Sequence, residues 1–190
     1  FSELLMWCIF FKITYFVHPK IVSNITQIYI PSKVEEIGFH AFFDCQSLTK
    51  VEIIDIENSK LFEIGKYAFA ESSIMQINIP REIEIINEFT FNCCSLLEEV
   101  KFAENSQLHT IDHYSFAGNL KLKRINIPKS IVALSYRSFI NTPLLESIMI
   151  ESNKNFVVMD NNEIYSKLNH GLIFVPRNLK HFKIKEKCSI

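Results

Sequence analysis

Residues 30–53 read IPSKVEEIGFHAFFDCQSLTKVEI, and the pattern of this stretch returns four more times, with substitutions, along the 190-residue chain. In every copy an aliphatic residue and a phenylalanine are separated by four variable residues. The phenylalanines that anchor the five copies are Phe42, Phe69, Phe91, Phe116 and Phe139. Self-similarity with a period of about 20–50 residues is typical of repeat architectures, in which each copy is one supersecondary unit.

Apolar residues at fixed distances from each anchor extend the motif into a complete unit. They recur five and eight positions before the phenylalanine and, in four of the five copies, six, nine and eleven positions after it. The segment LTKVEI at 48–53 alternates apolar and polar residues, as a half-buried strand does. Proline follows this strand in three copies, at Pro31, Pro80 and Pro128, and it ends the strand because it cannot donate to a ladder.

Stacking is necessary in such a protein, because one repeat cannot bury its own apolar face. We therefore predict a β-rich solenoid of about five stacked repeats with short strands. The five anchor phenylalanines should lie above one another inside it as a structural core ladder. Complete burial of one phenylalanine side chain is worth about 1.5–3 kcal/mol, and we expect the five phenylalanines, together with four aliphatic ladders, to form the core.

The motif resembles the BspA-like leucine-rich repeat, whose pattern combines Ile-Pro, Ile-Gly and Ala-Phe with a downstream Cys and Leu. The matching positions within residues 30–53 are Ile30, Pro31, Val34, Ile37, Gly38, Ala41, Phe42, Cys45, Leu48, Val51 and Ile53. Successive anchors are 27, 22, 25 and 23 residues apart, within the range of about 20–29 residues found in leucine-rich repeats. The resemblance covers residues 21–150, which we interpret as the repeat region.

The resemblance carries an expectation of function. Proteins of this family are typically surface or secreted proteins linked with adhesion and antigenicity. The resemblance thus implies a non-enzymatic binding module of a cell-surface or secreted adhesin or antigen, which recognises a protein or glycan through the solenoid surface. The alternative is an intracellular scaffold for protein–protein interaction, built on the same solenoid.

The two ends of the chain do not follow the phenylalanine repeat. Residues 151–190 resemble a hairpin-type spacer followed by the start of a further repeat, and residues 1–20 resemble a second such hairpin. The alternative for the apolar N-terminal stretch is part of a signal h-region or a membrane anchor. We favour the hairpin, since Glu3 and Lys12 interrupt the stretch and it is shorter than the ~20 residues of a spanning helix.

Composition argues against several other classes of function. Hydrophobic residues make up 48% of the chain, which argues against disorder, and the net charge of -1 offers no sign of the basic stripe of a nucleic-acid-binding protein. The 4 glycines leave little material for phosphate-binding loops. The sequence lacks the Gly-x-Ser-x-Gly, His-Glu-x-x-His and phosphate-loop motifs. We therefore expect no catalytic residues, no metal site and no cofactor.

Two pairs of residues have spacings that could indicate a metal site or a disulfide, but their positions in the repeat argue against both. His109 and His113 have the spacing of metal ligands on a helix, but they fall between ladder positions, so we expect them on the solvated surface. Cys45 and Cys94 occupy the same repeat position two repeats apart, which is near 10 Å at about 4.8 Å per strand. A disulfide requires Cα atoms within roughly 7 Å, so both are predicted to be free, buried thiols.

The best candidates for binding are the outward-facing strand positions, because solenoids recognise partners through extended surfaces. These positions form two rows of mixed charged and amide side chains, with Tyr29 and Met149 as apolar members near the two ends. One row is Gln27, Lys50, Gln76, Glu99, Arg124 and Ser147, and the other is Tyr29, Glu52, Asn78, Lys101, Asn126 and Met149. The alternative is that these residues are simply solvated strand positions.

Overall fold

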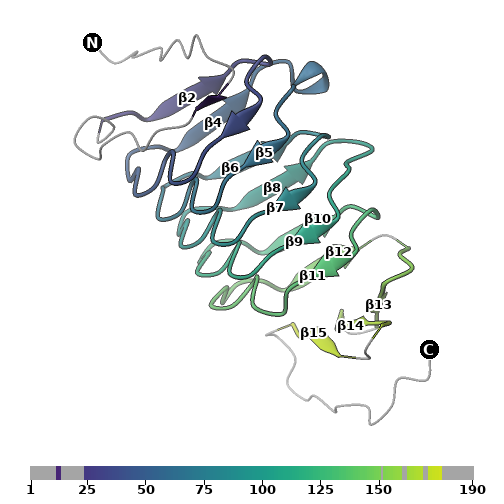
Figure 1. Cartoon of the computed structure of the whole chain (residues 1–190). Helices are drawn as coiled ribbons and strands as arrows, with labels where there is room; N and C mark the ends of the chain where they lie inside the picture. The colour runs from purple at the N-terminus through teal and green to yellow at the C-terminus, as the bar shows by residue number, and fades with distance from the viewer. Residues whose placement is uncertain (1–11, 14–23, 151, 160–161, 169–170, 177–190) are drawn as a thin grey trace.

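The computed structural model describes residues 12–13, 24–150, 152–159, 162–168 and 171–176. Its chain winds as a coil of similar turns that progress from the N-terminal to the C-terminal end (Figure 1). Each turn contributes one longer and one shorter strand to two separate sides of the coil. The predicted β-rich solenoid of about five repeats is confirmed.

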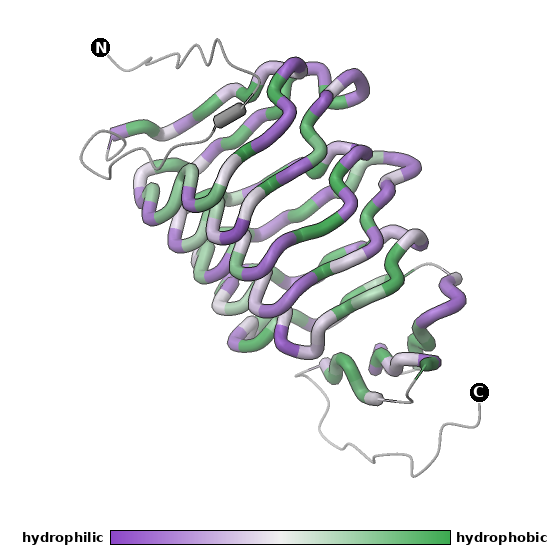
Figure 2. The backbone as a smooth tube through the Cα atoms, in the orientation of Figure 1, coloured by the Kyte–Doolittle hydropathy of each residue, from purple (hydrophilic) through white to green (hydrophobic). Residues whose placement is uncertain are grey.

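The longer strands have four residues each and form one side of the solenoid. They are β2 Gln27–Ile30, β4 Lys50–Ile53, β6 Gln76–Ile79, β8 Glu99–Phe102, β10 Arg124–Ile127 and β12 Ser147–Ile150. Along β6 and β10 exposed and buried residues alternate strictly, as the period of two in a strand requires. The same alternation of hydropathy runs along the backbone of the coil in Figure 2.

The shorter strands have two residues each and form the opposite side. They are β1 Lys12–Ile13, β3 Glu36–Ile37, β5 Glu63–Ile64, β7 Ile85–Ile86, β9 Thr110–Ile111 and β11 Ala133–Leu134. In both sets the neighbouring strands that hydrogen-bond to one another run parallel. The short strands pair in the orders β1-β3-β5 and β7-β9-β11. A 3-10 turn, η1 Ile56–Asn58, lies in the connection after β4.

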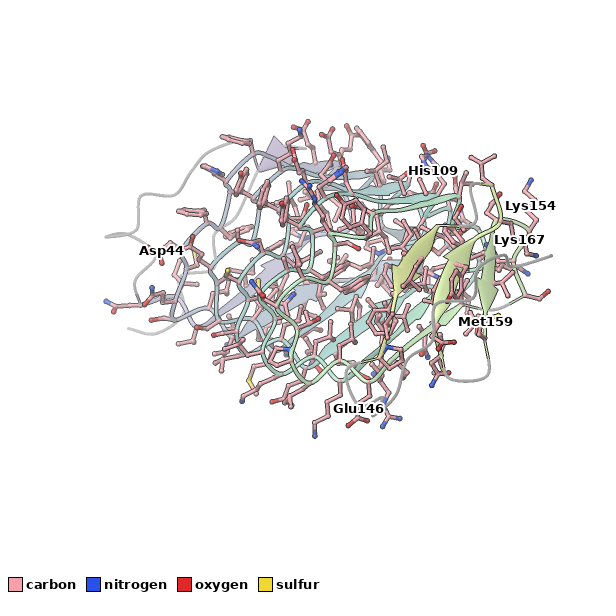
Figure 3. The ribbon with its side chains drawn as sticks, turned by 90° about the horizontal axis from the view of Figure 1, so that it is seen from below. Asp44, His109, Glu146, Lys154, Met159 and Lys167 are labelled. Atoms are coloured by element: carbon pink, nitrogen blue, oxygen red, sulfur yellow. The ribbon has the colours of Figure 1, made fainter. Side chains whose placement is uncertain are left out.

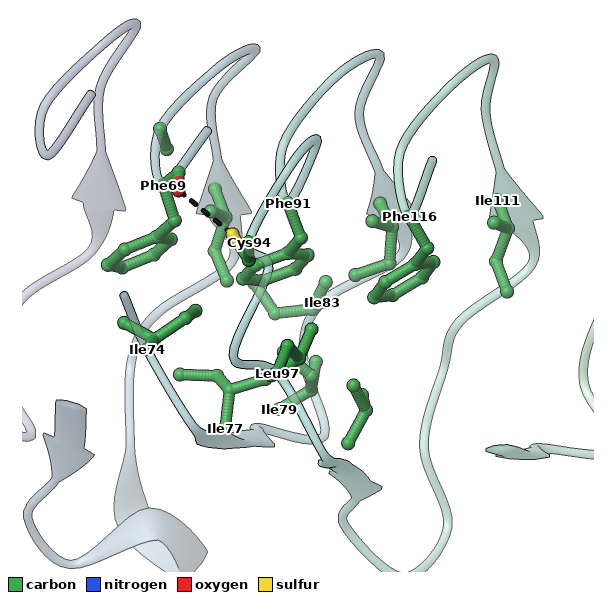
Figure 4. Packing of buried hydrophobic residues seen from close by; sticks show 14 of the residues in the cluster. Phe69, Ile74, Ile77, Ile79, Ile83, Phe91, Cys94, Leu97, Ile111 and Phe116 are labelled. Atoms are coloured by element: carbon green, nitrogen blue, oxygen red, sulfur yellow. Dashed lines mark hydrogen bonds between the residues drawn. The ribbon is translucent and has the colours of Figure 1, made fainter. Parts of the chain in front are cut away.

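The anchor phenylalanines form one continuous stack through the core. Consecutive ring centroids, from Phe42 to Phe139, are 5.2, 5.6, 5.4 and 5.5 Å apart, and neighbouring ring planes differ by no more than 14°. Phe69, Phe91 and Phe116 have no exposed surface. Figure 4 shows these three rings side by side, with Ile83 and Leu97 among the aliphatic residues that fill the rest of the core.

The corners that hold the phenylalanines have a repeating backbone conformation. The residue two positions after each anchor lies in the left-handed region, and in four copies so does the residue two positions before it. The residues after the anchors are Asp44, Glu71, Cys93, Gly118 and Asn141, and those before them are His40, Tyr67, Phe89 and Tyr114. The left-handed conformation is unfavourable for any residue that has a Cβ. The packing of the adjacent anchor phenylalanine offsets this cost.

Buried polar side chains satisfy the backbone at the same corners. Thr90, Ser115 and Ser138, which directly precede an anchor, donate their hydroxyls to the carbonyl three residues earlier, at 2.6–3.0 Å. Asn119, three positions after Phe116, donates its amide to the carbonyl of Phe116 and also to that of the preceding anchor, Phe91. The three hydroxyls thus close their own turn, and Asn119 ties its turn to the preceding one.

Pairing between the longer strands alternates between extensive and sparse. The β2–β4, β6–β8 and β10–β12 pairs each share four residue pairs in register, whereas β4 and β6 share one, Lys50 with Gln76. Within the described chain, β8 and β10 share none, and the sheet divides there into a four-stranded and a two-stranded part. The strands that pair poorly with their predecessor, β6 and β10, are followed by Pro80 and Pro128.

Proline gives a physical reason for these loose joints. At the tight joints the residue after the strand donates to the preceding turn: Ile54 to the carbonyl of Ile30 at 2.9 Å, and Ala103 to that of Ile79 at 3.0 Å. Pro80 and Pro128 occupy the equivalent position and have no N–H to donate. Each loose joint therefore lacks the hydrogen bond that closes the end of the ladder elsewhere.

The C-terminal end of the core is covered by an antiparallel sheet. Its strands are β13 Phe156–Val158, β14 Ile164–Ser166 and β15 Leu172–Phe174, in the order β13-β14-β15. Phe156 and Ile164 join the core cluster. At the other end β1 pairs in parallel with β3, and the remainder of residues 1–20 lies outside the described residues, as do residues 177–190. The assignment of both ends as spacer hairpins, and of 21–150 as a separate region, stays a prediction.

Replacing the central anchor, Phe91, with Ala should reduce the free energy of unfolding by about 3–5 kcal/mol, because a fully buried ring leaves a cavity between two stacked neighbours. The measurement is urea-induced unfolding followed by circular dichroism. Phe62→Ala is the matched control: Phe62 is 51% exposed, and its loss should change stability by no more than about 0.5 kcal/mol. Equal losses for the two variants would contradict the core ladder.

Candidate binding face

The twelve candidate residues all lie on the longer strands with their side chains directed away from the core, and we call this surface the long-strand face. Gln27, Lys50 and Ser147 are half-buried. The exposed members are Tyr29, Glu52, Gln76, Asn78, Glu99, Lys101, Arg124, Asn126 and Met149. The strand register aligns members of each row, for example Gln76 with Glu99 and Asn126 with Met149.

Most charges on the first part of this face are neutralised locally. The Lys50 ammonium lies 2.7 Å from the Glu52 carboxylate and 5.4 Å from the centre of the Tyr29 ring. The hydrogen bond to Glu52, followed by the charge of that carboxylate, raises the pKa of Lys50. The Lys101 ammonium lies 2.9 Å from the Glu99 carboxylate in the same way. Exposed pairs of this kind contribute little to stability, but they leave little net charge where they occur.

The face is hollowed where β8 and β10 fail to pair. A groove of about 680 Å³ lies there, lined on one side by residues 98–101 and on the other by Lys121, Lys123, Arg124 and Asn126, with Leu144 at its edge. A second hollow of about 790 Å³ continues from Asn126 toward the turns after the two strands. The two hollows meet at Asn126, so the groove follows the strand direction; we call it the β8/β10 groove.

Uncompensated positive charge gathers in this groove. Four cationic and two acidic side chains line its first part, which leaves a net of two positive charges. The Lys121 ammonium lies 3.2 Å from the Glu98 carboxylate, and Lys101 is paired with Glu99. Among the described residues, no acidic side chain lies within ion-pair distance of Lys123 or Arg124. The sequence reasoning did not single out this cluster: Lys121, Lys123 and Arg124 lie close together in one repeat, but Lys101, on the other side of the groove, comes from the preceding repeat.

The two histidines lie away from the long-strand face. His109 and Glu146 are on opposite sides of the solenoid in Figure 3. His109 contacts Glu84 at 3.4 Å, while His113 Nδ1 lies 2.8 Å from Asp112 Oδ1. Burial raises the pKa of Asp112, but the hydrogen bonds from His113 outweigh it and hold that pKa below its ordinary value. Over the residues that the structure describes, no group of three or more His, Cys, Asp or Glu side chains could hold a metal ion.

The cysteine prediction is confirmed in the described chain. Cys45 and Cys94 are free and buried, and Cys94 donates to the carbonyl of Phe69 at 3.1 Å. Burial raises the pKa of Cys94 to about 12, and burial with the nearby Asp44 carboxylate raises that of Cys45 to about 11. Both thiols are therefore protonated at neutral pH and pack as small apolar groups. Cys93 is free and exposed.

A second ladder of aromatic side chains, missed by the sequence reasoning, runs along the corner before the anchors. The Tyr67 and Phe89 ring centroids are 4.6 Å apart, and those of Phe89 and Tyr114 are 4.9 Å apart, with nearly parallel planes. The Arg137 guanidinium lies 5.9 Å from the centre of the Tyr114 ring. An aromatic ring two positions before the anchor in four copies, counting His40, was the signal that could have revealed it. Because these rings cover one another's faces, they stabilise the corner and leave few faces for a ligand.

Comparison with known proteins agrees with this architecture. The family model described as "BspA type Leucine rich repeat region (6 copies)" matches residues 20–144 and 104–188. No curated protein matches the chain. Among the residues described, no helix has the length and apolar character that crossing a membrane requires.

Several solved structures are similar. The pneumococcal vaccine antigen PcpA is 27% identical, with a TM-score of 0.74 over 80% of this chain and 37% of its own. A leucine-rich cell surface protein from Faecalibacterium prausnitzii is 25% identical, with a TM-score of 0.64 over 87% of this chain and 49% of its own. A leucine-rich repeat protein from Bacteroides ovatus is 26% identical, with a TM-score of 0.51 over 68% of this chain and 38% of its own. The chain thus spans less than half the length of each.

Of the three cysteines in the described chain, Cys93 should be alkylated by iodoacetamide in the native protein and Cys45 and Cys94 should not, because Cys93 alone among these three is exposed and the thiolate is the reactive form. Since burial, and then the Glu71 carboxylate, raises the pKa of Cys93, its rate should increase from pH 7 to pH 9. Peptide mapping by mass spectrometry measures both effects, with guanidinium-unfolded protein as the control in which all three react. Native alkylation of Cys94, or a Cys45–Cys94 bridge, would contradict the packing.

Proposed function

This chain belongs to the BspA-type leucine-rich repeat family, and we propose that it is the binding region of a cell-surface or secreted adhesin or antigen. In this proposal it recognises a protein or glycan through the long-strand face and carries out no reaction. Its most direct support is the match to surface proteins: one similar structure is a vaccine antigen and another a cell surface protein. The sequence features of the repeat led to the same expectation.

The form of the face supports a binding role. Nine exposed side chains of mixed chemistry lie in two rows on a regular stack of strands, and extended surfaces of this kind suit recognition of large partners. The face also has a groove whose volume lies within the range of about 300–1,000 Å³ typical of ligand sites. The histidines, which could serve catalysis, lie on the other side and bond to single carboxylates. A binding role thus requires fewer additional assumptions than an enzymatic one.

The surface location can be tested by immunolabelling. An antibody raised against residues 24–150 should label intact cells of the source organism, or its culture medium should contain the protein. Permeabilised cells serve as the control for total protein. Labelling that appears only after permeabilisation, with none in the medium, would favour the alternative, an intracellular scaffold for protein–protein interaction.

The long-strand face can be tested with a bulky substitution that does not depend on ligand chemistry. Asn78→Trp places a large side chain at the exposed centre of the face and should reduce affinity at least ten-fold for a ligand identified on arrays of extracellular-matrix proteins and mucosal glycans. His113→Trp, exposed on the other side, is the matched control and should leave affinity unchanged. Equal affinities for both variants, measured by biolayer interferometry, would place the binding surface elsewhere.

A further inference from the structure

The β8/β10 groove differs from the rest of the long-strand face in shape. It lies at a joint without ladder pairing and runs parallel to the strands from Glu98 and Lys121 to the turns that contain Glu104 and Lys129. The end near the turns is partly apolar, since Phe102, Pro128 and Met149 line it, and Met149 is 47% exposed. An occupant that fits this shape is elongated, and it places polar groups at one end and an apolar group at the other.

The groove also differs in charge. Lys123 and Arg124 are adjacent, exposed and without an acidic partner in the described chain, and they stand beside the amide of Asn126. The other loose joint, between β4 and β6, shows that an open joint alone does not create such a site. Its outward cation, Lys50, is already paired with Glu52. The combination of a groove with unpaired cations is therefore specific to β8/β10.

We propose that the β8/β10 groove binds an extended acidic segment of a partner protein, with the segment's carboxylates on Lys123 and Arg124 and an apolar side chain against Phe102 and Met149. This inference rests on the proposed function, because it assigns a partner class to the same face. Arginine binds carboxylates through two parallel hydrogen bonds, and the apolar end adds contact area that a small anion could not use.

The acidic side chains in the groove favour a peptide over a uniform polyanion. Glu98 and Glu99 line the wall opposite Lys123 and Arg124, and they would repel a sulfated glycan or a nucleic acid that carries negative charge along its whole length. A peptide carries backbone N–H groups that can donate hydrogen bonds to these carboxylates, and it can carry acidic side chains at one end and an apolar side chain at the other. The net of two positive charges suits a segment with a few carboxylates.

The test uses fluorescence anisotropy with a fluorescein-labelled hexapeptide of three Glu followed by three Leu, which matches the charged end and the apolar end of the groove. We expect saturable binding that weakens as salt is raised from about 50 to 200 mM, because exposed charges are screened. A hexapeptide of three Gln followed by three Leu should bind at least ten-fold more weakly. Equal affinity for the two peptides, or no binding of the acidic one, would overturn the proposal. Binding of a sulfated oligosaccharide in preference to the acidic peptide would also overturn it and assign the groove to an anionic glycan.

Charge reversal in the groove provides the matched variants. The double variant K123E/R124E should lose at least ten-fold in affinity for the acidic peptide, whereas K60E/R81E, which makes the same change in net charge away from the groove, should lose less than three-fold. Thermal melting of both variants shows whether they remain folded. Equal losses would mean that net charge, and not the groove, attracts the peptide.

The same variants separate this inference from the proposed function. If K123E/R124E keeps full affinity for the array ligand while Asn78→Trp loses it, the long-strand face binds but the groove assignment is wrong. If the acidic peptide binds through Lys123 and Arg124 but the protein is found only inside cells, the groove assignment stands and the surface location fails.

Discussion

Each turn of this solenoid is too short to enclose its own phenylalanine, so every anchor ring must be covered by the turns before and after it. The strand spacing of about 4.8 Å in a stack is close to the separation at which aromatic rings pack well, and the observed ring separations of 5.2–5.6 Å satisfy both. The left-handed corner residues and the buried hydroxyls hold the backbone in the conformation that places each ring at that spacing. The outward side chains on the longer strands are regularly spaced for the same reason, because each turn stacks on the one before it.

The repeat could be predicted from sequence because it depends on residues at fixed intervals. The burial of Phe91, the free thiols of Cys45 and Cys94, and the outward direction of residues such as Asn78 all follow from one register. The aromatic ladder through Tyr67 and Phe89 was missed because its members differ in polarity and its last position holds Arg137. A repeat pattern therefore identifies the positions that hold similar residues in every turn more readily than the positions whose residues differ in polarity.

The groove could not be predicted for a different reason. It depends on a relation between neighbouring turns: the missing donor at Pro128, the splitting of the sheet between β8 and β10, and cations from separate repeats that meet across the gap. Proline was recognised as the end of a strand, but its effect on pairing with the preceding strand appears only when the turns are placed side by side. The sequence shows no basic stripe, and in the described residues of the groove the positive charge forms a local cluster between two strands.

The alternation of tight and loose joints also has a mechanical meaning. Strands β2 with β4, β6 with β8, and β10 with β12 are each joined by four residue pairs, so the long-strand side behaves as three stiff blocks connected by two compliant seams. A load that bends this side of the rod concentrates its strain at those seams, because they contain the fewest hydrogen bonds to resist it. In a protein that holds two bodies together, such seams let the rod yield by small angles before the phenylalanine stack itself has to open.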